Sequence, residues 1–316
     1  MKISINALPL LDPLTGVGNY IYQLIKHFNL LPHLNEYTYY YGYFTERPLG
    51  NKFIYQIKKF LRGIPILGPN LRGATRILSR FQFKDFDIYF EPNFIPLNIS
   101  AKKIVTTVHD FSFLLYPEAH PKDRIDYFSK HFFRNITRSD AIITVSHYIK
   151  AEALNVLKSS ATMITAIHLG VDHSLFKTID KSALANFRRG RSLPENFILF
   201  VGNIEPRKNL RRLLHAYLRL PGSIKEEFKL VLIGPEGWKN EEVREILERT
   251  KHNTIYLPYM DAQQLSYVYN LAAVFVFPSL YEGFGLPPLE AMACGCPAVV
   301  SKASSLPEVC GDAGHY

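Results

Sequence analysis

Apolar residues gather along the chain in short runs, and amphipathic stretches with helical spacing separate these runs. In the first half, the runs are rich in β-branched and aromatic residues, which predicts buried strands. The expected strands are Lys2–Ala7, Tyr37–Phe44, Phe86–Phe90, Lys103–His109, Ala141–Val145 and Thr162–Ile167. The expected helices are Asn19–Phe28, the region 52–82, Pro121–Arg138 and Tyr148–Leu157.

The same alternation returns in the second half. The expected strands are Phe197–Val201, Lys229–Ile233, Thr254–Leu257, Val274–Phe277 and Ala298–Val300. The expected helices are Leu210–Leu218, Glu241–Thr250, Ala262–Asn270 and Pro287–Cys294. Strands that alternate with helices are typical of α/β folds with parallel sheets. We therefore predict two Rossmann-like, doubly wound domains, residues 1–175 and 195–316, joined by a charged linker at 176–194. Ligands would bind at strand carboxyl ends that face a cleft between the domains.

The segment 278–300 carries the strongest chemical signal in the chain. Its sequence is PSLYEGFGLPPLEAMACGCPAVV, and it follows a short apolar run. Gly283 and Gly285 favour a turn, and the two prolines after it suit the first turn of a helix. Strand, glycine turn and helix, in this order, form phosphate sites in α/β folds.

Two carboxylates flank this turn. Glu282 falls on the loop, and Glu290 falls in the first turn of the expected helix. Both can accept hydrogen bonds from hydroxyl pairs, while the turn and the helix start offer backbone N–H groups to an anion. A ligand that is part sugar and part phosphate would satisfy all of them. Taken singly, Glu290 has the alternative of complementing the helix dipole, and Glu282 that of a solvated loop residue.

Three further groups lie at strand ends or helix starts. Gly16 lies in a glycine turn before a helix, which suits contact with a diphosphate; the third glycine of a dinucleotide fingerprint is absent, so nicotinamide binding is not supported. Arg207 and Lys208 follow a buried strand and would offer positive charge to a pyrophosphate leaving group. His109 ends a strand, where it could bond a sugar hydroxyl or move a proton. The alternatives are a solvated Arg-Lys loop and a structural histidine.

Composition narrows the class of protein. The 316 residues are 47% apolar and 21% charged, as in a globular protein of about two domains. No apolar run is long enough for a membrane span, and the N-terminus does not resemble a signal peptide. The three cysteines suggest no disulfide framework. These features predict a cytoplasmic protein.

The net charge of +9 is unevenly distributed. Residues 47–84 contain nine Lys or Arg and no Asp or Glu, with apolar residues at helical spacing between the charges. A basic amphipathic helix is a candidate for peripheral contact with the inner face of the cytoplasmic membrane. The alternative is a solvated face over a core stripe. No motif that recognises RNA or DNA is present, so a nucleic-acid partner is not expected.

Several segments together resemble glycosyltransferase family 4, a family of retaining enzymes with the two-domain GT-B fold. The segments are the pair Glu282 and Glu290, separated by seven residues, and the stretches VGNIEPRKNL, VTTVHDFSFLLYPEAHP, ITVSHYIKAEAL and IHLGVDHSLF. The resemblance spans essentially the whole chain and is closest to bacterial mannosyltransferases of surface-polysaccharide synthesis. It implies transfer of a hexose, with mannose and GDP-mannose as candidates, from a nucleotide-diphosphate sugar to a lipid-linked or oligosaccharide acceptor.

The resemblance also assigns roles around the sugar. It implies that Glu290 binds the ribose hydroxyls of the donor. Glu282, with the backbone N–H groups of Phe284 and Gly285, would hold the transferred sugar. His109 would lie beside this sugar from the other domain.

The diphosphate would be held by a second group of residues. The resemblance implies contacts from the Leu286 N–H, Arg207, Lys208 and Gly16. The resemblance implies that no metal or other cofactor is needed, which fits a site where Arg207 and Lys208 supply the positive charge. Asn203 stands where many family members carry an arginine, and the charge of Arg207 is the candidate replacement.

The chain ends at Tyr316, where family members continue through another strand and several helices. We therefore expect the second domain to be incomplete at its C-terminus. The alternative to an active transferase is a catalytically inactive nucleotide-sugar-binding protein or a truncated fragment.

Overall fold

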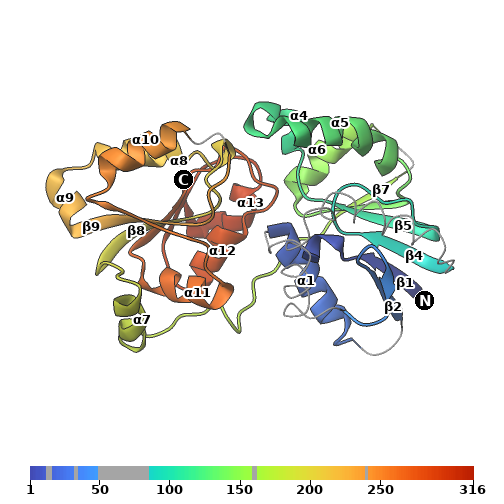
Figure 1. Cartoon of the computed structure of the whole chain (residues 1–316), viewed down its shortest axis with the longest axis horizontal. Helices are drawn as coiled ribbons and strands as arrows, with labels where there is room; N and C mark the ends of the chain where they lie inside the picture. Colours follow the sequence, from blue (N-terminus) through green and yellow to red (C-terminus); the bar gives the residue numbers. More distant parts are fainter. Residues whose placement is uncertain (12–15, 32–34, 49–84, 159–161, 239–240) are drawn as a thin grey trace, which may run out of the picture. The chain divides into compact units, whose positions relative to one another are not determined.

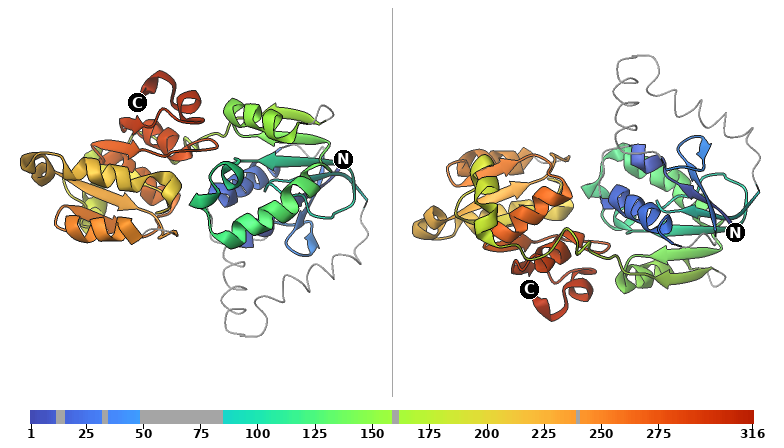
Figure 2. Two further views of the ribbon diagram at one scale, coloured as in Figure 1. Left: turned by 90° about the horizontal axis from the view of Figure 1, so that it is seen from above. Right: turned by 90° about the horizontal axis from the view of Figure 1, so that it is seen from below.

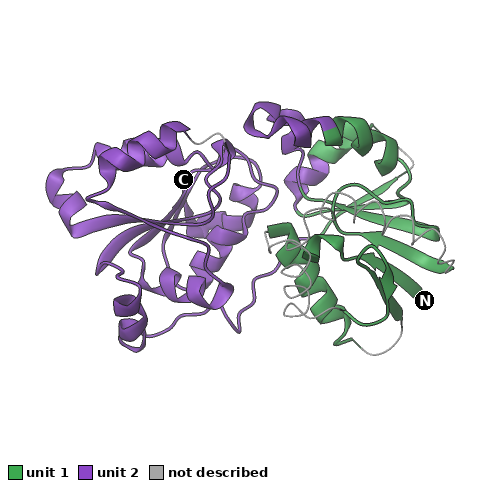
Figure 3. Ribbon diagram, viewed as in Figure 1, with its two compact units in different colours: residues 1–109, 127–145, 152–167 green, residues 110–126, 146–151, 168–316 purple. Residues whose placement is uncertain are grey.

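The structure, a computed structural model, describes residues 1–11, 16–31, 35–48, 85–158, 162–238 and 241–316. The expected helix in 52–82 and nearly all of the basic region 47–84 lie outside the described residues. The chain divides into two compact units (Figure 3). Unit 1 comprises residues 1–109, 127–145 and 152–167, and unit 2 comprises residues 110–126, 146–151 and 168–316.

Unit 1 is built on a seven-stranded sheet with the order β3-β2-β1-β4-β5-β6-β7 (Figure 1). Its strands are β1 (Lys2–Asn6), β2 (Glu36–Tyr40), β3 (Phe44–Thr45), β4 (Phe86–Glu91), β5 (Ala101–Val108), β6 (Ala141–Thr144) and β7 (Met163–Ala166). Neighbouring strands run parallel, except that β3 is antiparallel to β2. The chain winds outward from β1 in both directions, so the sheet is doubly wound, with its switch point between β1 and β4.

Helix α1 (Gly16–Phe28) covers the centre of this sheet. Its buried residues Ile21 and Ile25 lie in one core cluster with Ile5 of β1 and Tyr39 of β2. Two more helices, α5 (Lys122–Ile136) and α6 (His147–Leu157), begin in segments that belong to unit 2 and continue in unit 1.

Unit 2 contains a six-stranded parallel sheet with the order β10-β9-β8-β11-β12-β13. The strands are β8 (Asn196–Val201), β9 (Phe228–Ile233), β10 (Thr254–Leu257), β11 (Val274–Phe277), β12 (Ala298–Val300) and β13 (Gly314–His315). The helices are α4 (Ser112–Leu115), α7 (Ala185–Gly190), α8 (Leu210–Leu218), α9 (Gly222–Glu227), α10 (Glu241–Thr250), α11 (Ala262–Leu271), α12 (Leu286–Ala293) and α13 (Leu306–Cys310). Throughout the described ranges, no helix has the length and apolar character needed to cross a bilayer.

Both faces of this second sheet are buried. Side chains alternate along a strand, so Phe197 and Leu199 of β8 join one core cluster while Phe200 joins another. Figure 1 shows α8 and α10 on one face and α11 and α12 on the other, and Figure 2 gives the views from above and below. Burial on both faces explains why these strands are nearly continuous apolar runs.

Two predicted elements of unit 1 differ from the structure by more than two residues at an end or in the number of strands. The single strand expected at Tyr37–Phe44 is two strands, β2 and β3, which are separated by a turn at Gly42 with a φ of 92°. Glycine adopts this left-handed conformation without a steric penalty, so the chain reverses there. Helix α1 begins at Gly16 rather than at Asn19.

The segment predicted as a linker at 176–194 contains ordered helical structure. It includes a 3-10 helix, η3 (Lys181–Leu184), and helix α7. Phe176, Leu184 and Leu193 are buried in the core cluster that covers the second sheet. The sequence did not reveal these three buried residues, because they lie far apart among charged residues and follow neither a helical nor a strand period.

Unit 1 also buries a carboxylic acid at the end of β4. Glu91 is 0% exposed. Its oxygens accept bonds from Asn6 Nδ2 at 2.9 and 2.8 Å, the Tyr89 hydroxyl at 2.6 Å and the Asn93 N–H at 3.0 Å. Burial nevertheless dominates these bonds and raises the pKa of Glu91 from 4.5 to about 8. The folded chain therefore holds a proton here that the unfolded chain has released at neutral pH.

Substituting Glu91→Gln should change how stability depends on pH. Because the folded pKa lies above the unfolded value, this group costs stability as pH rises from about 5 to about 8, by about 1.4 kcal/mol per pH unit. The amide cannot ionise, so the variant should lose this slope, as urea unfolding at several pH values would measure. The exposed Glu226→Gln variant should keep the wild-type slope. Equal slopes in all three proteins would contradict the assignment.

Candidate active site

The candidate site lies where β8 and β11 end side by side, at the switch point of the second sheet. Hydrogen bonds join the two loops that follow these strands. Asn209 Nδ2 donates to the Pro278 carbonyl at 3.0 Å, and the Leu280 N–H donates to the Arg207 carbonyl at 2.8 Å. Arg207 Nη1 also donates to the Tyr281 carbonyl at 2.7 Å. The two loops therefore form one connected surface.

A buried cluster of charges lies on this surface. Glu282 is 7% exposed, and its carboxylate accepts Lys208 Nζ at 2.7 Å and Arg207 Nη1 at 3.2 Å. Arg207 Nη2 donates to Glu205 at 2.8 Å. Lys208 Nζ lies 4.9 Å from the centre of the Phe277 ring, a favourable distance for a cation over an aromatic face. The structure thus brings together Glu282, Arg207 and Lys208, three of the residues that the sequence analysis assigned to the donor site.

The cluster is held in its charged form. Burial pushes the pKa of Glu282 upward, but the adjacent Lys208 and Arg207 outweigh it and hold the pKa below its ordinary value. Burial likewise opposes ionisation of Asp110, and the charge of Arg207 together with bonds from Ser112 lowers its pKa. Both carboxylates are therefore ionised at neutral pH.

Two serine hydroxyl groups donate hydrogen bonds to backbone carbonyls in and next to the Gly-Phe-Gly turn. Ser305 Oγ lies 2.9 Å from the Glu282 carbonyl and 2.8 Å from the Phe284 carbonyl, so its one proton is shared between them. Ser146 Oγ donates to the Gly283 carbonyl at 2.8 Å. These hydrogen bonds from the serine hydroxyls to the backbone carbonyls fix the shape of the turn.

Gly285 requires glycine for two reasons. Its φ of 112° lies in the left-handed region. A Cβ atom at this position would lie 2.7 Å from Leu306 Cδ2, and Leu306 is fully buried. The residue is the N-cap of α12, which begins at Leu286.

The start of α12 offers few hydrogen-bond donors. Pro287 and Pro288 have no N–H, so Leu286 supplies the N–H group among the first three helical residues. This matches the predicted role of Leu286 as an anion contact, although that role stays a prediction.

Glu290 lies apart from the charge cluster. It is the fifth residue of α12, which begins one residue earlier than expected, so it falls beyond the first turn. The Tyr269 hydroxyl donates to its Oε2 at 3.2 Å. Burial raises the pKa of Glu290 from 4.5 to about 7, and the bond from Tyr269 only partly offsets this. The carboxyl group is therefore close to half protonated at neutral pH.

The two predicted site residues of the first half belong to unit 1. His109 is buried, and its Nε2 lies 2.8 Å from the Pro92 carbonyl, which fixes a proton on this nitrogen. The rings of Tyr20 and Phe94 pack against it at centroid distances of 5.0 and 5.3 Å. Gly16 is exposed at the first position of α1. The roles predicted for His109 and Gly16 beside the donor stay predictions.

Sequence reasoning missed several residues that shape the site. Glu205 stands two residues before Arg207, and an acid so close to a predicted cation was a usable signal. Asp110 directly follows the predicted His109, and its electrostatic link to Arg207 needed the fold. Ser146 and Ser305 contact the turn from distant parts of the sequence, and no local pattern marks them.

Two doubly wound, mostly parallel sheets in one chain, with charged loops at a switch point, are typical of the GT-B fold of glycosyltransferases. Solved structures confirm this fold. Sucrose-phosphate synthase from Thermosynechococcus elongatus matches 99% of this chain and 85% of its own, with a TM-score of 0.65 and 18% identity. HepE from Anabaena, solved in complex with UDP and glucose, matches 98% of this chain and 82% of its own, with a TM-score of 0.59 and 17% identity.

Sequence comparison then gives the family. "Glycosyltransferase Family 4" matches residues 14–175, and "Glycosyl transferases group 1" matches residues 184–315. O-antigen chain mannosyltransferase B of Escherichia coli is 35% identical over 328 residues, which cover 99% of this chain and 86% of that protein. The mannosyltransferase WbdA of Escherichia coli is 36% identical over 228 residues, which cover 69% of this chain and 27% of that protein. The chain belongs to glycosyltransferase family 4 and is a glycosyltransferase, as the sequence motifs indicated.

Substituting Gly285→Ala should destabilise unit 2. The positive φ and the contact with buried Leu306 together predict a loss of about 1–3 kcal/mol in the free energy of unfolding, measured by urea titration. Gly222→Ala, at the start of α9, meets no atom within 4 Å and should change stability by less than about 0.5 kcal/mol. A Gly285→Ala variant as stable as this control would show that the turn relaxes freely.

Proposed function

We propose that the chain is a retaining hexosyltransferase that moves a hexose, with mannose as the first candidate, from a nucleotide-diphosphate sugar to a lipid-linked or oligosaccharide acceptor. The observation that carries the proposal is the buried cluster of Glu282, Arg207 and Lys208 beside a glycine turn at the switch point of unit 2. Relatives named as O-antigen mannosyltransferases support the choice of hexose.

The cluster suits a diphosphate because its cations have donors to spare. Lys208 uses one of its three N–H donors on Glu282. Arg207 Nε has no hydrogen-bond partner among the described residues. A diphosphate at this edge would meet both cations, together with the Leu286 N–H at the start of α12. By the family resemblance, Gly16 would also contact the diphosphate.

The carboxylates suit the hydroxyl groups of the donor. Glu282, fixed between two cations, presents an ionised acceptor to hydroxyls of the transferred sugar. The N–H groups of Phe284 and Gly285 would complete this contact, and His109 would lie beside the same sugar. Glu290 would accept the ribose hydroxyl pair. Because such bonds favour the ionised form, donor binding would lower the pKa of Glu290 below its value of about 7.

The reaction would proceed with retention of configuration. The bond from the anomeric carbon to the diphosphate oxygen breaks, and the diphosphate leaves with the electron pair. The acceptor oxygen forms its bond to the same face of that carbon, and its proton passes to the departing phosphate oxygen. Arg207 and Lys208 would stabilise the charge that develops on the leaving group.

A lipid-linked acceptor would require access to a membrane surface. The basic region 47–84 is the sequence feature that suggests such peripheral contact at the cytoplasmic face. GDP-mannose as donor and this membrane contact are both parts of the proposal.

Substituting Glu282→Gln should lower the rate of sugar transfer by at least about 100-fold. The amide keeps the size of the side chain but removes the charge that balances Lys208 and Arg207. The assay measures transfer of radiolabelled sugar from GDP-mannose and from a panel of other nucleotide sugars. Calorimetry with the free nucleotide separates a loss of transfer from a loss of nucleotide binding, because the carboxylate contacts the sugar in this proposal.

Glu242→Gln is the matched control, since Glu242 forms an exposed ion pair with Arg211. It should transfer sugar at the wild-type rate. Thermal melting of each variant separates a loss of folding from a loss of chemistry. Full activity in a folded Glu282→Gln variant would refute the assignment, and nucleotide binding without turnover in the wild type would favour an inactive binding protein.

We also propose that transfer needs no divalent cation, because Arg207 and Lys208 supply the positive charge at the diphosphate. Excess EDTA should leave the initial rate unchanged within about twofold. A rate that collapses with EDTA and returns with Mg²⁺ or Mn²⁺ would overturn this part of the proposal.

A further inference from the structure

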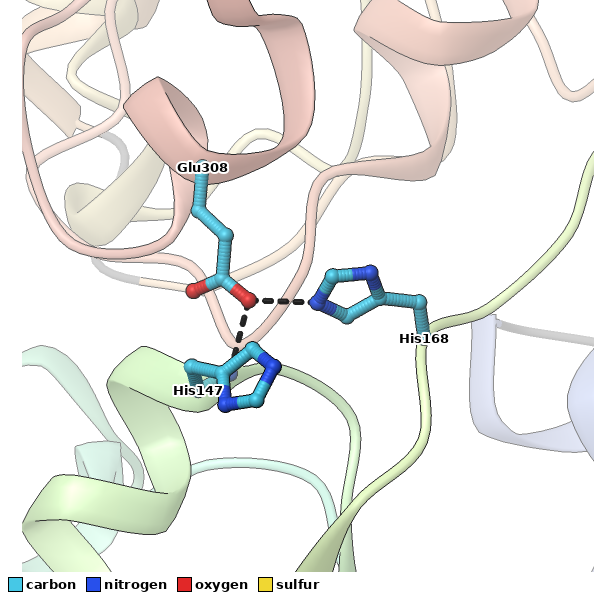
Figure 4. A group of neighbouring side chains, drawn as sticks. All are labelled: His147, His168 and Glu308. Carbon is cyan, nitrogen blue, oxygen red and sulfur yellow. Dashed lines mark hydrogen bonds and ion pairs between the residues drawn. The ribbon is translucent and has the colours of Figure 1, made fainter.

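Two histidines and a glutamate meet on unit 2 outside the charge cluster (Figure 4). His147 is the first residue of α6, His168 follows β7, and Glu308 lies on α13. One ligand atom from each residue lies within 4.8 Å of those of the other two. The residues come from three separate segments, so only the fold brings them together.

The carboxylate of Glu308 is already oriented by the backbone. Its Oε1 accepts the His147 N–H at 2.7 Å, and its Oε2 accepts the Tyr148 N–H at 2.9 Å. Partial burial opposes ionisation, but these two bonds and the contact with His168 outweigh it and lower the pKa of Glu308. Two backbone N–H groups therefore hold this carboxylate in a fixed direction, as hydrogen bonds from the protein do for metal ligands.

The imidazoles are accessible from solvent. His168 is 47% exposed, and its Nε2 lies 2.5 Å from Glu308 Oε1. His147 is also exposed and bonds Glu308 through its backbone N–H, so its ring takes no part in that bond (Figure 4). The two rings lie edge to face with centroids 5.4 Å apart.

We propose that His147, His168 and Glu308 form a binding site for a divalent transition metal of the Zn²⁺ type. Two imidazoles and one carboxylate are a donor set that suits Zn²⁺, Ni²⁺ or Co²⁺ better than Mg²⁺. Tetrahedral ligands at about 2.1 Å from a metal lie about 3.4 Å from one another. The metal would replace the short His168–Glu308 contact, and a rotation of the exposed His147 ring would complete the third position, with water as the fourth ligand.

The proposed metal ligands lie next to residues that pack against the Gly-Phe-Gly turn. The His168 ring packs against the Phe284 ring with centroids 5.8 Å apart. Glu308 shares α13 with Leu306, whose side chain lies under Gly285. A metal that links α6, His168 and α13 would therefore restrict the motion of the residues that pack against the Gly-Phe-Gly turn. This role is separate from sugar transfer.

The test is calorimetric titration of the full chain, without an affinity tag, with Zn²⁺, Ni²⁺ and Mg²⁺. We expect one Zn²⁺ per chain and much weaker binding of Mg²⁺. His147→Ala and His168→Ala should each weaken Zn²⁺ binding by at least about tenfold. The two hydrogen bonds that Glu308 accepts at the start of α6 survive His147→Ala, because their donors are backbone N–H groups.

His252→Ala is the matched control, since His252 is exposed and lies outside the cluster. It should bind Zn²⁺ like the wild type. Co²⁺ provides a second readout, because its visible absorption reports coordination by imidazole and should disappear in His147→Ala. Unchanged Zn²⁺ affinity in both cluster variants, or an equal loss in His252→Ala, would overturn the proposal.

Discussion

Glu282 carries a negative charge inside unit 2, and the two cations beside it make that charge tolerable. An isolated carboxylate at this depth would cost several kcal/mol in lost hydration. Lys208 and Arg207 remove that cost by direct bonds, and Glu205 and Asp110 in turn balance Arg207. The loops at the edge of the second sheet are thus held by charge and hydrogen bonds, whereas the layers beneath them are held by apolar packing.

The order of the strands is what allows this pairing. Arg207 and Glu282 lie 75 positions apart in the sequence. They meet because the chain continues from β8 through β9 and β10 on one side of that strand. It then returns as β11, which pairs with the other side of β8. The helices that follow these two strands, α8 and α12, lie on opposite faces of the sheet, and such switch points are where α/β folds bind ligands. Fold and chemistry therefore depend on the same feature of topology.

Several helices and strands of unit 2, and two residues of its charge cluster, could be predicted from the sequence. Contacts that depend on tertiary packing could not. The bounds of β10, β11, β12, α8 and α10 agree with expectation because apolar periodicity alone determines them. Arg207 and Glu282 were recognised because each follows a strand. Ser305 was not, since its contact with the turn depends on three-dimensional packing. Phe176 was assigned to a linker because a lone apolar anchor among charges has no period to reveal it.

The paired prolines at the start of α12 have a thermodynamic consequence. Each ring fixes one backbone dihedral near its helical value in the unfolded chain as well as in the folded one. Less conformational entropy is therefore lost when this helix start forms, and little remains to be lost when a ligand arrives. Pro287 and Pro288 give up two hydrogen-bond donors and gain a helix start that is rigid in advance. The affinity of a ligand that bound there would depend on complementarity to one shape rather than on the ordering of a loop.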